Sequence, residues 1–146
     1  MNNNKYLDIR MRSFINDHHI LGLATVADNK PYCATMFYAF LEEHNAFVIN
    51  SSDDTQHGIN MLNNNEVSGT IALETKIIGK IQGIQLCGKI CRIEEFENEV
   101  AARTAYFRRF PYASFSQPQL WVIKLDFVKM TDNRLGFGKK LIWKKD

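Results

Sequence analysis

Short apolar segments separated by turn-forming residues follow one another along most of this 146-residue chain. Such short apolar segments, in part β-branched and bounded by turn residues, predict strands. Most connections are too short for a crossover helix, so the pattern favours a largely antiparallel barrel over a βαβ sheet. The clearest example is a half-exposed strand whose buried face is expected to consist of Trp121, Ile123, Leu125 and Phe127.

About seven strands and three short helices are expected. The strands are predicted at residues 19–26, 32–41, 46–50, 66–75, 83–94, 121–129 and 141–143. The strand at 32–41 is apolar on both faces, which predicts that both faces are covered. Glycines at 69, 83 and 88 indicate bulges or sharp bends.

The helices are predicted at 5–18, at 55–62 and from 96 to the residue before Pro111, because proline disfavours a helical residue before it. The second is expected to end in left-handed asparagines at 63–65. The predicted buried faces are Leu7, Met11, Phe14 and Ile15 in the first helix, Ile59 with Leu62 or Met61 in the second, and Phe96, Val100, Thr104 and Phe107 in the third.

Composition limits the class of protein. Hydrophobic residues make up 45% of the chain and charged residues 23%, which predicts one folded domain over residues 1–146. The net charge of +2 argues against nucleic acid or an anionic membrane as the main partner. Three cysteines and a polar start without an apolar run predict a cytoplasmic protein with reduced thiols.

The segment from Ser51 to His57 concentrates groups that bind anions. Hydroxyl side chains, an imidazole and free backbone N–H groups meet at the positive end of a predicted helix, which favours phosphate. Thr55 could instead cap the helix, with His57 as an exposed helical residue. Asp53 and Asp54 favour capping, because carboxylates repel a phosphate unless they point away.

The glycine-rich turn at 136–140 does not match a nucleotide-binding loop. Asn133 and Lys140 stand where a phosphate loop needs glycine and a hydroxyl residue. The turn either presents solvated lysines or attracts an anionic ligand through lysines that include Lys139. Cys87 and Cys91 share a strand face without a second pair of ligands, so no metal site is predicted.

Three arginines lie on or just past the third predicted helix, at positions 103, 108 and 109. Cations near the C-terminal end of a helix are favoured by its dipole. The alternative is a basic rim around an anionic substrate, with Tyr106 or Tyr112 as a stacking surface.

Two sets of residues point to a known family. Pro31 begins a strand, Ser51 ends another, and the helix at 55–61 is followed by Val67, an order that resembles the FMN-binding split-barrel proteins, which include pyridoxamine 5′-phosphate oxidase. The segments YFRRFP at 106–111 and TDNRLGFGKKLIW at 131–143 resemble more specifically the uncharacterised YhbP-like bacterial family. This second resemblance covers nearly the full chain.

The resemblance implies a mainly β fold, a six- to seven-stranded antiparallel split barrel of Greek-key type. It also implies a homodimer with two FMN sites between the subunits. The family pattern has arginine at Ala34 and a basic pair at 56–57, so positive charge is missing here. The predicted cofactor site consists of Ala34, Thr35, Met36 and Phe37 beside the flavin ring, Ser51, Thr55 and His57 around the phosphate, and Ser52, Gln56 and Lys139.

Two functions remain open from the sequence. The first is an FMN-dependent oxidoreductase with a small substrate and NADH or NADPH as electron donor, in which the flavin carries the redox chemistry. The second is a non-catalytic module that binds FMN, haem or another flat anionic ligand. For haem, His57 or the His18–His19 pair is the candidate axial ligand. No side chain is predicted to act as a catalytic acid or base.

Overall fold

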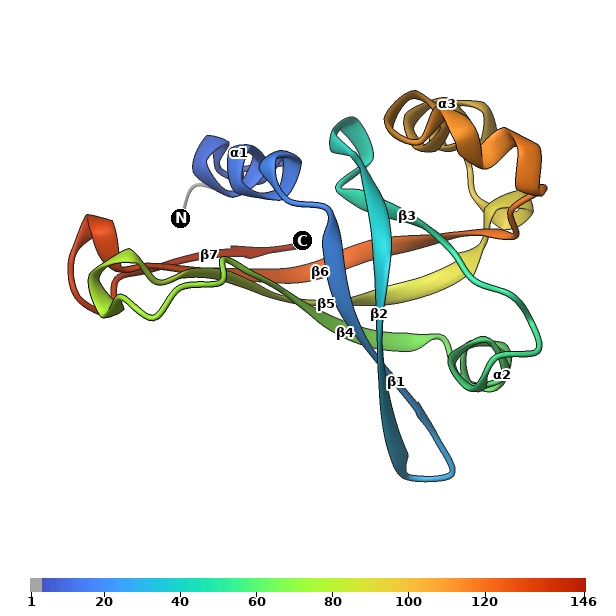
Figure 1. The fold of residues 1–146 in the computed structure, drawn as a ribbon, viewed down its shortest axis with the longest axis horizontal. Helices are drawn as coiled ribbons and strands as arrows, with labels where there is room; N and C mark the ends of the chain where they lie inside the picture. The colour runs from blue at the N-terminus through green and yellow to red at the C-terminus, as the bar shows by residue number, and fades with distance from the viewer. Residues whose placement is uncertain (1–3) are drawn as a thin grey trace.

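Seven antiparallel strands form one sheet in the order β3-β2-β1-β4-β5-β6-β7 (Figure 1). The computed structural model describes residues 4–146. The strands are β1 (Ile20–Ala27), β2 (Lys30–Leu41), β3 (Ala46–Asn50), β4 (Glu66–Ala72), β5 (Gln82–Arg92), β6 (Leu120–Asp132) and β7 (Lys140–Lys144), and the α-helices are α1 (Ile9–Asp17), α2 (Gln56–Asn63) and α3 (Glu99–Arg109).

The sheet closes into a barrel because β6 has two successive partners along one edge. β5 pairs along the other edge, while β3 pairs with β6 at residues 120–124 and β7 pairs with it at 127–131. The β3–β6 pairing closes a six-stranded barrel, and β7 is the additional strand. The predicted mainly β, antiparallel split barrel is confirmed.

α1 contributes to the main hydrophobic core inside the barrel. Met11, Phe14 and Ile15 are buried there with Leu7, which precedes the helix. The helix begins at Ile9, four residues later than predicted, because the Asp8 side chain accepts a hydrogen bond from the Arg10 backbone N–H and caps it. The described α-helices include none that is both long and apolar enough to cross a membrane.

α3 covers the outer face of the barrel and forms a second hydrophobic core over β2, β3 and β6. The predicted buried face of this helix is partly wrong. Ala102 and Tyr106 face the sheet, whereas Val100 is 76% exposed and Thr104 is exposed. Residues two apart lie about 200° apart around a helix, so burying 102 and 106 turns 100 and 104 toward solvent.

A bulge in β6 reverses which residues face the core. Leu125 pairs with Gly88 and Phe127 pairs with Cys87, which leaves Asp126 as an extra residue. Val128 and Met130 therefore enter the core, and Phe127, predicted to be buried, lies outside it. A Cβ atom at Gly88 would lie 2.4 Å from the Lys124 carbonyl oxygen, so the bulge requires glycine there.

The first half of β6 also differs from the prediction of a half-exposed strand. Leu120 and Val122 are buried in the core under α3, opposite the side chains that face the barrel interior. Both faces are covered here because a helix packs on the outside of the sheet.

α2 buries Met61 and Asn60, whereas Ile59 and Leu62 are 43% and 53% exposed. Of the predicted buried face, only Met61 is confirmed. The helix ends at Asn63, and the φ of −148° and ψ of 119° of its C-cap residue Asn64 are extended, so the predicted left-handed end is also wrong.

Candidate functional site

The first half of β2 has a free edge. β1 pairs with the whole segment from Lys30 to Phe37, whereas β3 pairs with β2 only from Tyr38 onward. Within the described chain, residues 31–37 therefore have no strand partner on this second edge, and their outward N–H and C=O groups are available to a ligand. The predicted ring-binding segment at 34–37 lies within this half of β2.

Side chains of this segment alternate between the two faces of the sheet. Ala34 and Met36 pair with Leu23 and Leu21, which face the barrel interior, so they share that face. Thr35 and Phe37 point outward and are exposed, and the Phe37 ring lies 5.5 Å from that of Phe110. The prediction that both faces of β2 are covered is correct only from Tyr38 onward, where α3 packs over Ala39.

Ser51 fixes the start of the loop between β3 and α2. Its backbone N–H donates to the Gln119 carbonyl at 2.9 Å, and its own carbonyl accepts from the Trp121 indole at 3.0 Å. Ser51 is 3% exposed, and its hydroxyl makes one long contact of 3.4 Å to the Ser52 carbonyl. These bonds hold the loop against β6.

Thr55 caps α2. Its hydroxyl accepts from the Gly58 N–H at 3.0 Å and donates to the Ser52 carbonyl at 2.8 Å, while the Ser52 hydroxyl donates to the Asp54 carboxylate. The capping interpretation of Thr55 is therefore confirmed. The helix still leaves the first-turn N–H groups at 56 and 57 without an intrahelical acceptor, as an anion site requires.

One of the two carboxylates in this loop is neutralised. Asp53 forms an ion pair with Arg92, whose guanidinium carbon lies 4.7 Å from the centre of the Trp121 ring. This pairing weakens the predicted repulsion between Asp53 and a phosphate. Sequence reasoning missed Arg92, which lies 39 residues from Asp53 in the chain. The signal that could have found it is the β5–β6 register, which places Arg92 opposite Trp121.

Gln56 holds α2 against the barrel. Its side chain donates to Asn60 at 2.9 Å, and the Asn60 amide donates to the Thr25 hydroxyl of β1 at 3.0 Å. A groove of about 520 Å³ lies between this part of α2 and the β1–β2 hairpin, with Pro31 and Tyr32 of β2 in its wall. α2 and the free half of β2 thus border the same groove.

His57 is half-buried, and this burial lowers the pKa of its imidazole. The neutral ring is therefore favoured in the unliganded fold, and a bound anion would have to raise this pKa in order to charge it.

The lowered pKa of His57 predicts a pH dependence of stability. The pKa of a histidine in an unfolded chain is ~6.5, so near and below this pH the unfolded chain binds a proton at His57 more readily than the folded chain does. We expect the free energy of unfolding to fall less steeply between about pH 7 and about pH 5 in His57→Gln than in the wild type. Urea unfolding across this range measures the difference, and identical slopes would contradict the assignment.

Lys139 is not brought to this loop within one chain. It follows β6 in the turn toward β7, at the far left of Figure 1, while α2 lies at the right. Two of the arginines have structural partners: Arg103 pairs with Glu99 and Glu94, and Arg109 donates to the Asn16 and His18 carbonyls. Both arginines therefore have structural partners, but only Arg109 lies in the last turn of α3, as the dipole interpretation expects; Arg103 lies in its middle.

Comparison with known proteins agrees with this geometry. The family described as pyridoxamine 5′-phosphate oxidase matches residues 7–133. A UPF0306 protein of Photorhabdus laumondii is 39% identical over 132 residues, which cover 90% of this chain and 92% of that protein. A UPF0306 protein of Yersinia pestis is 40% identical over 132 residues, covering 90% and 89%.

Solved structures show the same fold at low identity. A heme-binding protein from Mycobacterium smegmatis has a TM-score of 0.75 at 22% identity, covering 91% of this chain and 55% of that one. A heme storage protein from Vibrio cholerae has a TM-score of 0.66 at 17% identity, covering 96% and 95%. An FAD-binding protein from Mesorhizobium loti has a TM-score of 0.67 at 13% identity, covering 86% and 93%.

The fold and its free strand edge thus define a split barrel of the pyridoxamine 5′-phosphate oxidase type. The chain belongs to the pyridoxamine 5′-phosphate oxidase family and, within it, to the UPF0306 proteins, the YhbP-like group predicted from the segments at 106–111 and 131–143.

Proposed function

We propose that this protein binds FMN beside the free edge of β2 and acts as a flavin-dependent oxidoreductase on a small substrate, with NADH or NADPH as electron donor. The observation that carries the proposal is the free backbone edge at 31–37, whose first residues, Pro31 and Tyr32, border the same groove as α2. A flat ring can lie along such an edge while the helix start receives its phosphate.

The start of α2, the loop before it and the free edge of β2 offer groups that fit this ligand. The N–H groups at 56 and 57, the Ser51 hydroxyl and the His57 imidazole would hold the phosphate. Thr55 would fix the helix start, because its hydroxyl already donates to Ser52 and accepts from Gly58. The backbone of residues 34–37 would orient the ring. When bound, FMN supplies hydride chemistry that amino-acid side chains lack. Arg92 keeps the Asp53 carboxylate paired, which lowers the negative potential at the phosphate position.

The second candidate is a non-catalytic module that binds haem or another flat anionic ligand. It is favoured by His57, because burial lowers its pKa and keeps the imidazole in the neutral form that coordinates iron. Two structural neighbours described as heme proteins support the same candidate. His18 is a further candidate, since its Nδ1 lies 2.7 Å from the Phe14 carbonyl oxygen, an arrangement that leaves Nε2 free to coordinate.

An absorbance spectrum of the protein purified without added cofactor separates these functions. The flavin proposal expects a yellow protein whose absorbance bleaches when NADH or NADPH is added. A flavin spectrum that does not bleach with either donor would contradict the proposed oxidoreductase activity but would still support FMN binding. A haem spectrum, or a colourless protein that binds neither ligand on titration, would overturn the FMN proposal.

We also propose that the protein is a homodimer paired through the outer face of β2, β1, β4 and β5. The strand registers place small, uncharged residues side by side on this face, which no other element of the described chain covers. Small side chains let two sheets approach closely over a wide area. Two rows of paired residues cross the four strands at the centre of this face. The first row is Cys33, Ala24, Ser68 and Cys87, and the second is Thr35, Gly22, Thr70 and Gln85. Lys139 remains in the predicted site only if the second copy supplies it.

Thr70→Arg tests this interface, because a charged side chain would be buried at its centre. We expect light scattering to give twice the 16.9 kDa chain mass for the wild type and the single mass for the variant. The matched control is Thr104→Arg on the exposed side of α3, which should stay dimeric. A monomeric wild type at micromolar concentration, or a dimeric Thr70→Arg, would contradict the proposal.

A further inference from the structure

The short 3₁₀ helix η4 (Pro111–Ser116) carries the two most exposed aromatic side chains of the described chain. Tyr112 is 85% exposed and Phe115 is 86% exposed. Residues three apart lie on the same side of a 3₁₀ helix, so these two rings share one face. Ala113, between them in the chain, packs against the second hydrophobic core instead. η4 therefore presents an aromatic face to solvent.

Both ends of η4 are attached to the proposed cofactor site. Phe110 directly precedes the helix, and its ring lies 5.5 Å from that of Phe37 in the predicted ring-binding segment of β2. Gln119 follows the helix and is bonded to the loop before α2. Its carbonyl accepts from the Ser51 N–H at 2.9 Å, and its side chain accepts from the Asp53 N–H at 2.9 Å. η4 thus links the free edge of β2 to the predicted phosphate loop.

Side-chain hydrogen bonds fix the conformation of η4. The Ser114 hydroxyl donates to the Pro111 carbonyl at 3.0 Å, and the Ser116 hydroxyl donates to the Ala113 carbonyl at 2.9 Å. Gln117 ends the helix in the left-handed conformation, with a φ of 49°. The two aromatic rings are therefore carried by a defined turn.

The segment around η4 is uncharged. Residues 110–123 include no acidic and no basic side chain. Of the arginines on α3, Arg103 is paired with carboxylates, and Arg108 and Arg109 line a hollow next to α1. Tyr106, the other predicted stacking residue, is buried. The stacking surface that the structure offers is thus aromatic and neutral.

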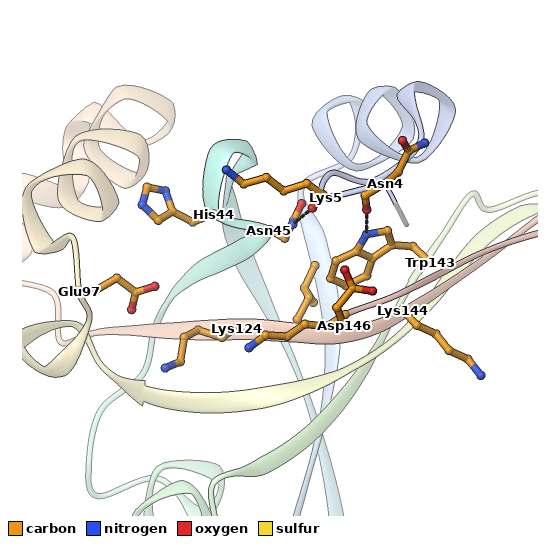
Figure 2. A pocket seen from close by; sticks show the side chains of 11 residues that line it. Asn4, Lys5, His44, Asn45, Glu97, Lys124, Trp143, Lys144 and Asp146 are labelled. Atoms are coloured by element: carbon orange, nitrogen blue, oxygen red, sulfur yellow. Dashed lines mark hydrogen bonds between the residues drawn. The ribbon is translucent and has the colours of Figure 1, made fainter. Parts of the chain in front are cut away.

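A cleft of about 370 Å³ beside the end of β7 offers no comparable surface (Figure 2). Figure 2 shows charged side chains, among them Lys5, Glu97 and Lys124, around its open side. Exposed charged groups are satisfied by water and lose hydration when a ligand covers them. Aromatic rings instead gain free energy when they are removed from water, so the exposed rings of η4 are the surface that favours a ligand.

The geometry points to a neutral, planar aromatic molecule as the small substrate of the proposed oxidoreductase, held against Tyr112 and Phe115. This inference rests on the proposed function, which places the flavin ring along residues 34–37, where Phe37 meets Phe110. A planar molecule can stack on the rings of η4 from the same side of β2. A charged molecule would lose hydration there without gaining a counter-charge from η4.

Binding of 2-naphthol to the full chain tests this surface, both without added flavin and with saturating FMN. This probe is planar, fluorescent and uncharged at neutral pH, so its fluorescence anisotropy measures the bound fraction. We expect saturable binding to the wild type. Tyr112→Ala and Phe115→Ala should each weaken 2-naphthol about threefold to tenfold, the effect of losing one aromatic contact, and leave FMN affinity unchanged. The control Val100→Ala truncates another exposed apolar side chain, on α3, and should bind 2-naphthol like the wild type.

Two charged probes with the same ring system, 2-naphthoate and 2-naphthylmethylammonium, should bind about fivefold or more weakly than 2-naphthol. Equal affinities for the three probes would overturn the assignment of a neutral substrate. Absence of saturable 2-naphthol binding up to about 5 mM, or an equal loss in Val100→Ala, would overturn the surface itself.

Light scattering of the η4 variants tests the competing occupant, a second copy of the chain. A lower mass for Tyr112→Ala or Phe115→Ala than for the wild type would show a subunit contact and overturn the inference. Weak 2-naphthol binding with intact FMN binding would overturn this inference alone. A wild type that binds 2-naphthol through η4 but binds no flavin would overturn the proposed function and, with it, the role of the bound molecule as its substrate.

Discussion

Replacing Leu125 by Ala is expected to lower the free energy of unfolding by about 2–5 kcal/mol, the usual cost of truncating a buried leucine. Leu125 is 2% exposed and belongs to the core inside the barrel. It also lies directly before the bulge in β6, where Gly88 lets the β5 backbone approach β6 closely. The cavity left by the substitution therefore has little room to collapse. Urea unfolding with a linear extrapolation to water measures the loss.

Phe127→Ala is the matched control, since it truncates a larger side chain two residues along the same strand. Phe127 lies outside the core because the bulge turns it away, so we expect a loss below about 1 kcal/mol. A loss for Phe127→Ala as large as that for Leu125→Ala would show that the β6 alternation continues without a bulge, as the sequence pattern predicted.

His57→Ala is expected to weaken FMN roughly tenfold to hundredfold if the α2 start holds the phosphate. The substitution removes a charge-assisted hydrogen bond worth about 1.5–3 kcal/mol. Riboflavin has the ring but no phosphate, so it should bind the wild type more weakly than FMN does. Its affinity for His57→Ala should be nearly the same as for the wild type. Fluorescence quenching of the two flavins measures both affinities.

His19→Ala is the control for this experiment, because burial and Arg109 also lower the pKa of His19 but it lies at the start of β1. It should leave FMN affinity unchanged. If His57→Ala weakened both flavins equally, His57 would act on the ring or on the fold. Equal wild-type affinity for FMN and riboflavin would leave the loop at 51–57 as a capped helix start and nothing more.

The candidate site could be predicted in part. The segment at 34–37 and the loop at 51–57 were both found from the sequence, because each is a local pattern: a strand that begins after a proline, and hydroxyl residues before a helix. Arg92 was missed because its partner Asp53 is distant in the chain.

The sequence by itself determined the strand and helix positions, the antiparallel barrel and the family. These depend on alternation, helical spacing and turn residues, all of which act between near neighbours. An example is β3, which forms at Ala46–Asn50 as predicted.

The tertiary structure alone decided which side of α2, of α3 and of the second half of β6 is buried and where the barrel splits. A bulge at Asp126 reverses the alternation of β6, and α3 covers one half of that strand. β2 is free before Tyr38 because β3 ends at Asn50, while the same residues of β3 pair with β6 through their other edge. Such features depend on which strand supplies the hydrogen bonds at each position, and residues distant in the chain make that choice.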